Sequence, residues 1–321
     1  MNRARWRAVA KWVWTALILA FVAVYAATRW DVVVAAWSLL TWAHAAFALA
    51  AIAVAKLCLT ATMRVAARRG GITLTFWQSF RLYNLSQLAK YLPGSVWQFV
   101  SRAAMLRERG AGAREIRDSM IAEHVWVLGF AAVLGSLLVL VTAPADVRAA
   151  LGSVASSDRF VVIAAVVGAV VAIALWAFRR SLASVWRWAL RLRPTPSVFA
   201  YLLVGWSLMG TSLWVIMVPF DGGGPLPYVI GLYGVAYVVG FVVPFAPAGI
   251  GVREAVLVGG ISPFVGNDVA IVVAATNRLM YLAVELVLGL VAVAKRAERD
   301  APPTTPDASA EPAPATSAAR R

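Results

Sequence analysis

The sequence has very little of what most metal centres and covalent cross-links require. Cys58 is its single cysteine, and it carries only two histidines, His44 and His124. A disulfide within the chain is therefore excluded, and a metal site built from cysteine or histidine is not expected. We predict neither a metal nor any other cofactor.

Charge is also scarce, since 14% of the 321 residues are charged and 61% are hydrophobic. A soluble domain of this length would carry about a quarter charged residues. The apolar residues come in blocks of about 20, the length that an α-helix needs to cross a bilayer. The sequence thus predicts an all-α, polytopic membrane helix bundle of about seven to eight spans. The expected spans lie near 9–28, 41–59, 119–142, 160–178, 198–219, 227–245 and 267–294.

Motifs of common active sites are missing as well. The chain has no glycine-rich nucleotide loop, no Gly-x-Ser-x-Gly elbow and no polar stretch large enough for a soluble catalytic domain. We name no catalytic residue and favour a function other than an enzyme. The expected domains are a membrane domain, 1–298, and a disordered cytoplasmic tail, 299–321, rich in Pro, Ala, Ser and Thr.

The net charge of +15 could indicate nucleic acid, but its distribution favours a membrane topology signal. Basic residues gather near 3–11, 64–69, 102–117, 179–193 and 295–299, whereas the alternate loops hold only Arg29, Arg148 and Arg159. We therefore expect a multi-pass protein of the bacterial inner membrane with both termini in the cytoplasm. Membrane lipids are the expected partners, nucleic acid is not, and the oligomeric state is left open.

Two apolar segments, 74–100 and 246–265, are interrupted by proline and glycine. The breaks contain Pro93 and Gly94 in the first segment, and Pro247, Gly249 and Gly251 in the second. Unpaired backbone groups cost several kcal/mol in hydrocarbon, so broken chain at depth must be buried in protein or line a cavity. Paired breaks in two halves also mark the binding sites of transporters. An ordinary surface turn is the alternative.

Charge counting predicts how these segments cross the bilayer. Both flanks of 74–100 are basic, so this segment is expected to dip in and return, whereas 246–265 is expected to cross. Both segments carry Arg-x-Ala-x-Leu after the break, so an internal duplication is a further hypothesis.

Ionisable residues within or beside the apolar blocks are the candidate binding residues. For an anionic lipid headgroup the candidates are Arg102, Arg253, Arg278, Glu123, Glu254, Glu285, Lys90 and Tyr91. Guanidinium groups match a phosphate with two parallel hydrogen bonds, and the glutamates would balance the cations or bind an amine. The alternatives are a topology charge for Arg102, an interfacial pair for Arg253 and Glu254, and a purely structural pairing for Arg278 and Glu285. Lys56 is interpreted as a side chain that snorkels from a helix end.

Two motifs carry a resemblance to a known family. Tyr91-Leu92-Pro93-Gly94-Ser95-Val96-Trp97 with Arg102, and 244–255 with Gly249, Gly251, Arg253 and Glu254, are similar to the lysylphosphatidylglycerol synthase transmembrane region, a flippase-like family. The resemblance covers about residues 10–295, and Arg278 and Glu285 suit its last helix. The chain departs from the family pattern at Ala248, where a glycine is expected.

This resemblance implies a lipid-handling protein. In the complete synthases the membrane region is credited with moving the modified lipid, and a fused domain performs aminoacyl transfer. We expect this chain to have the first activity and lack the second. The leading hypothesis is a flippase for an anionic or phosphate lipid. The alternatives are a transferase on a lipid-linked substrate, with Glu123 or Glu254 as base, and a non-catalytic partner of a cell-envelope glycosyltransferase or lipid-modifying enzyme.

Overall fold

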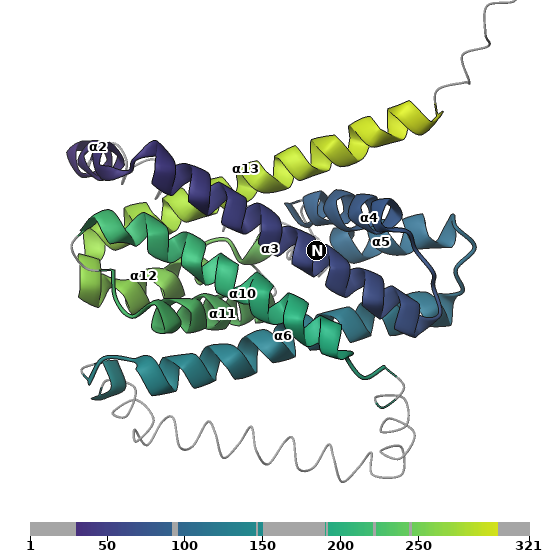
Figure 1. Cartoon of the computed structure of the whole chain (residues 1–321), viewed down its shortest axis with the longest axis horizontal. Helices are drawn as coiled ribbons and strands as arrows, with labels where there is room; N and C mark the ends of the chain where they lie inside the picture. The colour runs from purple at the N-terminus through teal and green to yellow at the C-terminus, as the bar shows by residue number, and fades with distance from the viewer. Residues whose placement is uncertain are drawn as a thin grey trace, which may run out of the picture.

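A computed structural model describes residues 30–91, 96–145, 147–149, 190, 192–220, 223–243 and 246–300, and helices are the only regular elements in these parts (Figure 1). In chain order the elements are α2 (Trp30–Leu39), α3 (Trp42–Gly70), α4 (Phe76–Leu88), η1 (Ala89–Tyr91), α5 (Trp97–Arg107), α6 (Ala113–Thr142), α10 (Pro196–Met217), η2 (Val218–Phe220), α11 (Leu226–Val242), η3 (Pro247–Gly249), α12 (Val252–Val265) and α13 (Asn267–Asp300). The predicted all-α class is confirmed.

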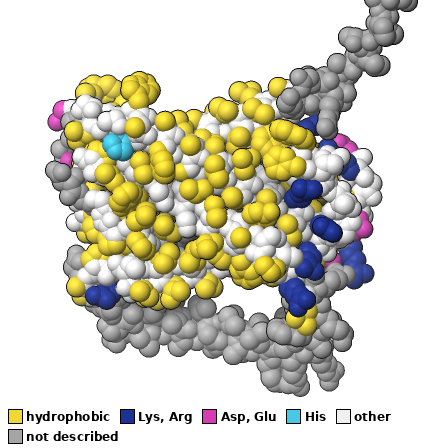
Figure 2. Space-filling view, viewed as in Figure 1, with side chains coloured by type: hydrophobic (Ala, Val, Ile, Leu, Met, Phe, Trp, Pro, Cys, Tyr) yellow, Lys and Arg dark blue, Asp and Glu magenta, His cyan; other side chains and the backbone are white. Residues whose placement is uncertain are grey.

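Four of the described helices are long and apolar enough to cross a bilayer: Trp42–Gly70, Ala113–Thr142, Pro196–Phe220 and Asn267–Ala294. They confirm the predicted helices near 41–59, 119–142, 198–219 and 267–294. The spans predicted near 9–28 and 160–178 lie outside the described residues. Large apolar side chains face outward along these helices, such as Val133 and Leu140 on α6. Figure 2 shows this apolar surface between the two ends of the molecule.

Charge is distributed unequally between those two ends. Exposed arginines gather where α3 ends and α6 begins, an end that we call the basic end (Figure 2). They include Arg64, Arg68, Arg107, Arg109, Arg114 and Arg117. The opposite end holds the start of α3 and the start of α13 (Figure 1).

The first broken segment forms a hairpin from the basic end. Thr75 caps α4 by accepting the N–H of Gln78, whose side chain in turn accepts the N–H of Thr75. At about 1.5 Å per residue, the 13 residues of α4 cannot cross a bilayer. The last residue of α3, Gly70, lies against Glu115 and Ser119 at the start of α6. Both flanks of the hairpin are therefore at one end, and the predicted return of 74–100 is confirmed.

The second broken segment forms a hairpin from the opposite end. Gly240, near the end of α11, lies against Arg253 at the start of α12. Further along, the Tyr228 hydroxyl donates to the Gly260 carbonyl. The two helices are thus antiparallel, and α12 returns to the end where α11 begins. The predictions that 227–245 is a span and that 246–265 crosses are both wrong, because α11 and α12 together form one hairpin. Charge counting fixes only the parity of crossings, and a hairpin leaves that parity unchanged.

The two hairpins meet at their broken tips, where η1 packs on η3 between the long helices. Glycine allows this close packing. A Cβ on Gly135 of α6 would lie 2.9 Å from the Gly231 carbonyl oxygen of α11, so the two backbones approach as small residues permit in membrane bundles.

Helix α2 was not predicted, because ten residues are too short for a span and the segment was interpreted as a loop. It is attached to α13 by the Trp37 indole N–H, which donates to the Thr276 hydroxyl at 3.1 Å.

Candidate functional site

The ring of Tyr281, on α13, is the centre of a buried polar cluster. Four cations lie over or beside it, at 5.0–5.8 Å from the ring centroid. These cations come from α3, η1, α12 and α13: Lys56, Lys90, Arg253 and Arg278. Aromatic faces attract cations, and the attraction is stronger where water is excluded. We call this set, with the residues described next, the tyrosine cluster.

Glu285 holds two of these cations with one carboxylate. Its Oε1 lies 2.5 Å from the Lys56 ammonium and 2.6 Å from the Lys90 ammonium, and its Oε2 accepts the Tyr91 hydroxyl at 2.6 Å. The side chains of Lys56 and Glu285 are 0% and 1% exposed. Two cations on one buried carboxylate leave an excess of positive charge at this point.

The Arg102–Glu123 pair forms the side of the cluster next to α5 and α6. The two side chains are in direct salt-bridge contact and both are buried. Arg102 Nε also donates to the Ser86 hydroxyl at 3.0 Å. Tyr83 joins this pair to the centre, since its ring centroid lies 5.3 Å from the Arg102 guanidinium and 5.1 Å from the Lys56 ammonium.

Arg253 has a different environment. It is 4% exposed, and its guanidinium lies 4.3 Å from the Tyr233 ring, 5.3 Å from Tyr281 and 5.8 Å from Tyr237. Among the described residues, no carboxylate lies within ion-pair distance of it. This arginine is buried among phenol rings without a neutralising acid in that part of the chain.

Arg278 and Glu254 support the broken tip of the second hairpin. Arg278 Nη2 donates to the Ala248 carbonyl at 3.1 Å, and its Nε lies 3.5 Å from Glu254. Glu254 in turn accepts the Gly251 N–H at 2.7 Å. Both residues thus hold the backbone around η3.

The cluster is rich in positive charge. Its described members include five cations, Lys56, Lys90, Arg102, Arg253 and Arg278, but only three carboxylates, Glu123, Glu254 and Glu285. By formal charge, the cations therefore exceed the carboxylates by two. In the described residues, no group of three His, Cys, Asp or Glu side chains could hold a metal ion.

Comparison with known families identifies the family to which the chain belongs. Residues 4–289 match the sequence model described as the lysylphosphatidylglycerol synthase TM region. The chain belongs to this family. Together with its apolar helices, this makes it an integral, multi-pass membrane protein whose outer surface contacts lipid. No curated protein matches the sequence.

All eight ionisable and phenolic candidates from the sequence lie in this family member's tyrosine cluster. Pro93 and Gly94 lie outside the described residues. Pro247 begins η3, and Gly249 and Gly251 have positive φ angles of 69° and 84° at the same tip. Arg278 and Glu285 share a face of α13 but bind different partners, Glu254 and Lys56 with Lys90.

Sequence reasoning missed several members of the cluster. The interpretation of Lys56 as a snorkelling side chain is wrong, because α3 continues to Gly70 and places Lys56 at its centre rather than near its end. The rings of Tyr83, Tyr233, Tyr237 and Tyr281 were also not predicted. Tyrosine is common at membrane interfaces, so residue type alone does not reveal a buried ring.

Proposed function

We propose that this protein moves a lipid with an anionic, phosphate-containing headgroup across the membrane. The observation that carries the proposal is the excess of two formal positive charges in the tyrosine cluster, with the buried Arg253 not paired to any described carboxylate. An unbalanced charge at membrane depth is costly, and such residues mark substrate pathways. One phosphate could neutralise this excess.

The chemistry of the cluster suits a phosphate group. A guanidinium donates two parallel hydrogen bonds to phosphate oxygens, and an ammonium adds a strong point charge. Arg253 comes from the second hairpin, whereas Lys90 comes from the first. A headgroup between them would thus contact both broken tips, which is how discontinuous helices bind substrates in transporters. Glu123 and Glu285 would hold Arg102, Lys56 and Lys90 in position.

Orientation belongs to the same proposal. Because basic residues favour the cytoplasmic side, we place the basic end in the cytoplasm of a bacterial cell, with α4 and α5 entering from that side. We also propose residues 1–298 as the membrane domain and 299–321 as its tail.

The test is a transport assay in liposomes with fluorescent phosphatidylglycerol and a quencher added outside. We expect the protein to increase the rate of lipid exchange between leaflets above that of empty liposomes. Arg253→Gln should slow it at least tenfold, since a hydrogen bond to a charged group contributes about 1.5–3 kcal/mol. The matched control is Arg109→Gln at the exposed basic end.

Two results would contradict the proposal. The first is an exchange rate equal to that of empty liposomes for fluorescent phosphatidylglycerol and for a polyprenyl phosphate. The second is full activity of Arg253→Gln at an unchanged unfolding temperature.

The geometry of the carboxylates gives little support to a transferase. Glu123 is paired with Arg102, and Glu254 is held by the Gly251 N–H and Arg278. A general base needs a free lone pair within reach of a substrate proton. Loss of a product in Glu254→Gln, with lipid movement intact, would reverse this preference.

A further inference from the structure

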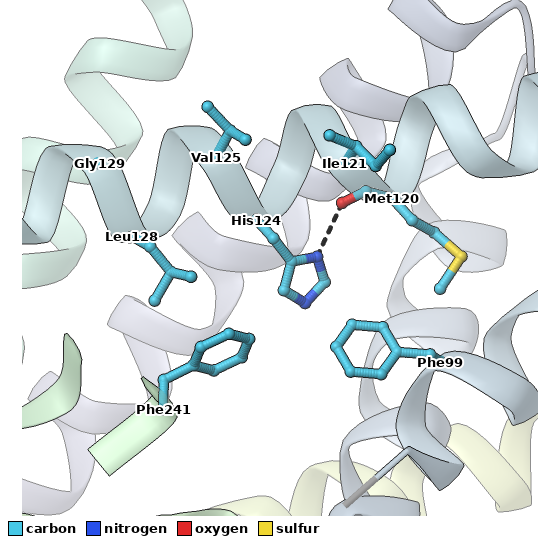
Figure 3. A pocket seen from close by; sticks show the side chains of 8 residues that line it. All are labelled: Phe99, Met120, Ile121, His124, Val125, Leu128, Gly129 and Phe241. Carbon is cyan, nitrogen blue, oxygen red and sulfur yellow. Dashed lines mark hydrogen bonds between the residues drawn. The ribbon is translucent and has the colours of Figure 1, made fainter. Parts of the chain in front are cut away.

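An apolar pocket opens beside the tyrosine cluster, between α5, α6 and the end of α11 (Figure 3). Its volume is about 420 Å³. The lining consists of Phe99, Met120, Ile121, His124, Val125, Leu128, Gly129 and Phe241. Among these eight, His124 has the only strongly polar side chain, and its Nδ1–H donates to the Met120 carbonyl at 2.8 Å. The two phenylalanine rings lie 4.9 Å and 5.8 Å from the imidazole.

We place the pocket at the level of the hydrocarbon core. Residues 120–129 run from seven residues after the start of α6, which spans Ala113–Thr142, to its centre. At its rim, Ile121 and Val125 are 39% and 60% exposed, on a helix long and apolar enough to cross the bilayer. At that depth the surrounding medium is lipid tails. An alkyl chain is therefore the available occupant with matching chemistry.

Three separate elements connect this pocket to the tyrosine cluster. On α5, Phe99 and Arg102 are three residues apart and share a helix face. On α6, His124 follows Glu123 directly. On α11, Phe241 follows Gly240, whose backbone lies against Arg253. The apolar pocket and the cationic cluster are thus adjacent. Together they match the two parts of an anionic lipid, its alkyl chain and its phosphate headgroup.

We propose that the pocket binds one alkyl chain of the same lipid whose phosphate is bound by the tyrosine cluster. The inference rests on the proposed function for its headgroup, and it adds the position of the tail. The lipid lies with its head between the hairpin tips and one chain passing out between Phe99 and Phe241 toward α6.

The test uses phosphatidylglycerol with a photoactivatable diazirine in one acyl chain, in liposomes with the full chain. We expect cross-links to Phe99, Phe241 and residues 120–129. Gly129→Phe should reduce them at least fivefold, because a Cβ at Gly129 has no atom within 4 Å and the added ring would fill the pocket. Gly259→Phe is the matched control, since Gly259 on α12 is equally open and does not line the pocket.

A second probe separates the transported lipid from bulk lipid. Diacylglycerol with the same diazirine chain lacks the phosphate, and we expect it to label the pocket less than one-fifth as strongly. Equal labelling by both probes would overturn the inference, because the chain would then come from any neighbouring lipid. Absence of labelling in the pocket would also overturn the inference. If Gly129→Phe then converted a dimer to a monomer, the pocket would be a contact with a second copy of the chain.

The transport assay distinguishes this inference from the proposed function. Pocket labelling by phosphatidylglycerol without lipid exchange would reject transport and support the chain site. Wild-type exchange by Gly129→Phe, with no cross-links in the pocket, would reject the chain site and support transport.

Discussion

Single charged residues have their largest effect where water is absent. Glu285 pairs with Lys56 and Lys90 at 2.5 Å and 2.6 Å, and neither Lys56 nor Glu285 is exposed. Removing one partner of a buried ion pair leaves an uncompensated charge, which costs more than the pair contributed. Each member of this triad should therefore respond differently to neutralisation.

Glu285→Gln should be the most damaging of these changes. It leaves two buried ammonium groups facing each other, and we expect the free energy of unfolding to fall by about 3–5 kcal/mol. Lys56→Met should cost less, because Lys90 still pairs with the carboxylate. Thermal unfolding in detergent measures both, with Glu108→Gln at the exposed basic end as the control. Unfolding of Glu285→Gln at the wild-type temperature would show that the triad does not stabilise the fold.

At this scale the sequence identified much of the site. Every ionisable candidate except Lys56 was recognised because a charge inside an apolar block is costly. The tyrosines were not recognised, because a tyrosine is equally compatible with an interface, a core or a binding site. Only the packing of α11, α12 and α13 shows that three phenol rings surround Arg253.

The two hairpins show how proline and glycine act on whole elements. At the tip of the second hairpin, Ala248, Gly249 and Gly251 all have positive φ angles. Glycine adopts this conformation freely, whereas a residue with a Cβ is strained there. Ala248, with φ 52° and ψ 22°, is the one non-glycine residue of the described chain in this region. It is also the position where the resemblance predicted a glycine.

Ala248→Gly should therefore stabilise the protein. The left-handed conformation costs alanine about 1–2 kcal/mol, and glycine removes this cost. Glycine also gives the unfolded chain more freedom, which lowers the free energy of unfolding by about 0.4–1 kcal/mol. We therefore expect the free energy of unfolding to rise by about 0.5–1 kcal/mol, which is measured as a higher unfolding temperature. Gly249→Ala should have the opposite effect, since its Cβ would lie 3.0 Å from the Gly240 carbonyl oxygen. Equal unfolding temperatures for the two variants would contradict this account of the tip.

The sequence predicted that both segments are broken, and charge counting predicted the return of the first segment but not that of the second. Pro93 and Pro247 mark the breaks because proline removes a backbone donor. The direction after a break depends on packing, such as Gly240 on Arg253, which no local pattern contains. Each hairpin consists of two short helices joined by a break, and the two hairpins enter from opposite ends of the molecule. This is the arrangement of an inverted repeat, so it agrees with the duplication hypothesis.

The molecule as a whole is polarised, with most of its exposed arginines at the basic end (Figure 2). The long spans and this asymmetry were predictable because helix length and loop charge are local properties of the sequence. How the basic end is oriented in the cell can be measured directly.

Cysteine labelling tests this orientation, since Cys58 is the only cysteine and Cys58→Ala removes it. In that background, Asn267→Cys lies at the end opposite the basic end, and Arg109→Cys lies at the basic end. A membrane-impermeant maleimide should label Asn267→Cys in intact cells but Arg109→Cys only after permeabilisation. The reverse pattern would place the basic end outside.

Helix α13 joins most of the molecule within ten residues. Thr276 binds α2, Asn277 binds Ser212 of α10, Arg278 reaches η3 and α12, and Glu285 binds α3 and η1. A rotation of α13 about its own axis would break these contacts together, because all of them come from one continuous helix. Packed polar contacts of this kind switch between discrete arrangements and do not deform continuously. Any rotation of α13 would therefore be felt at once by α2, α3, α10, α12 and both broken tips.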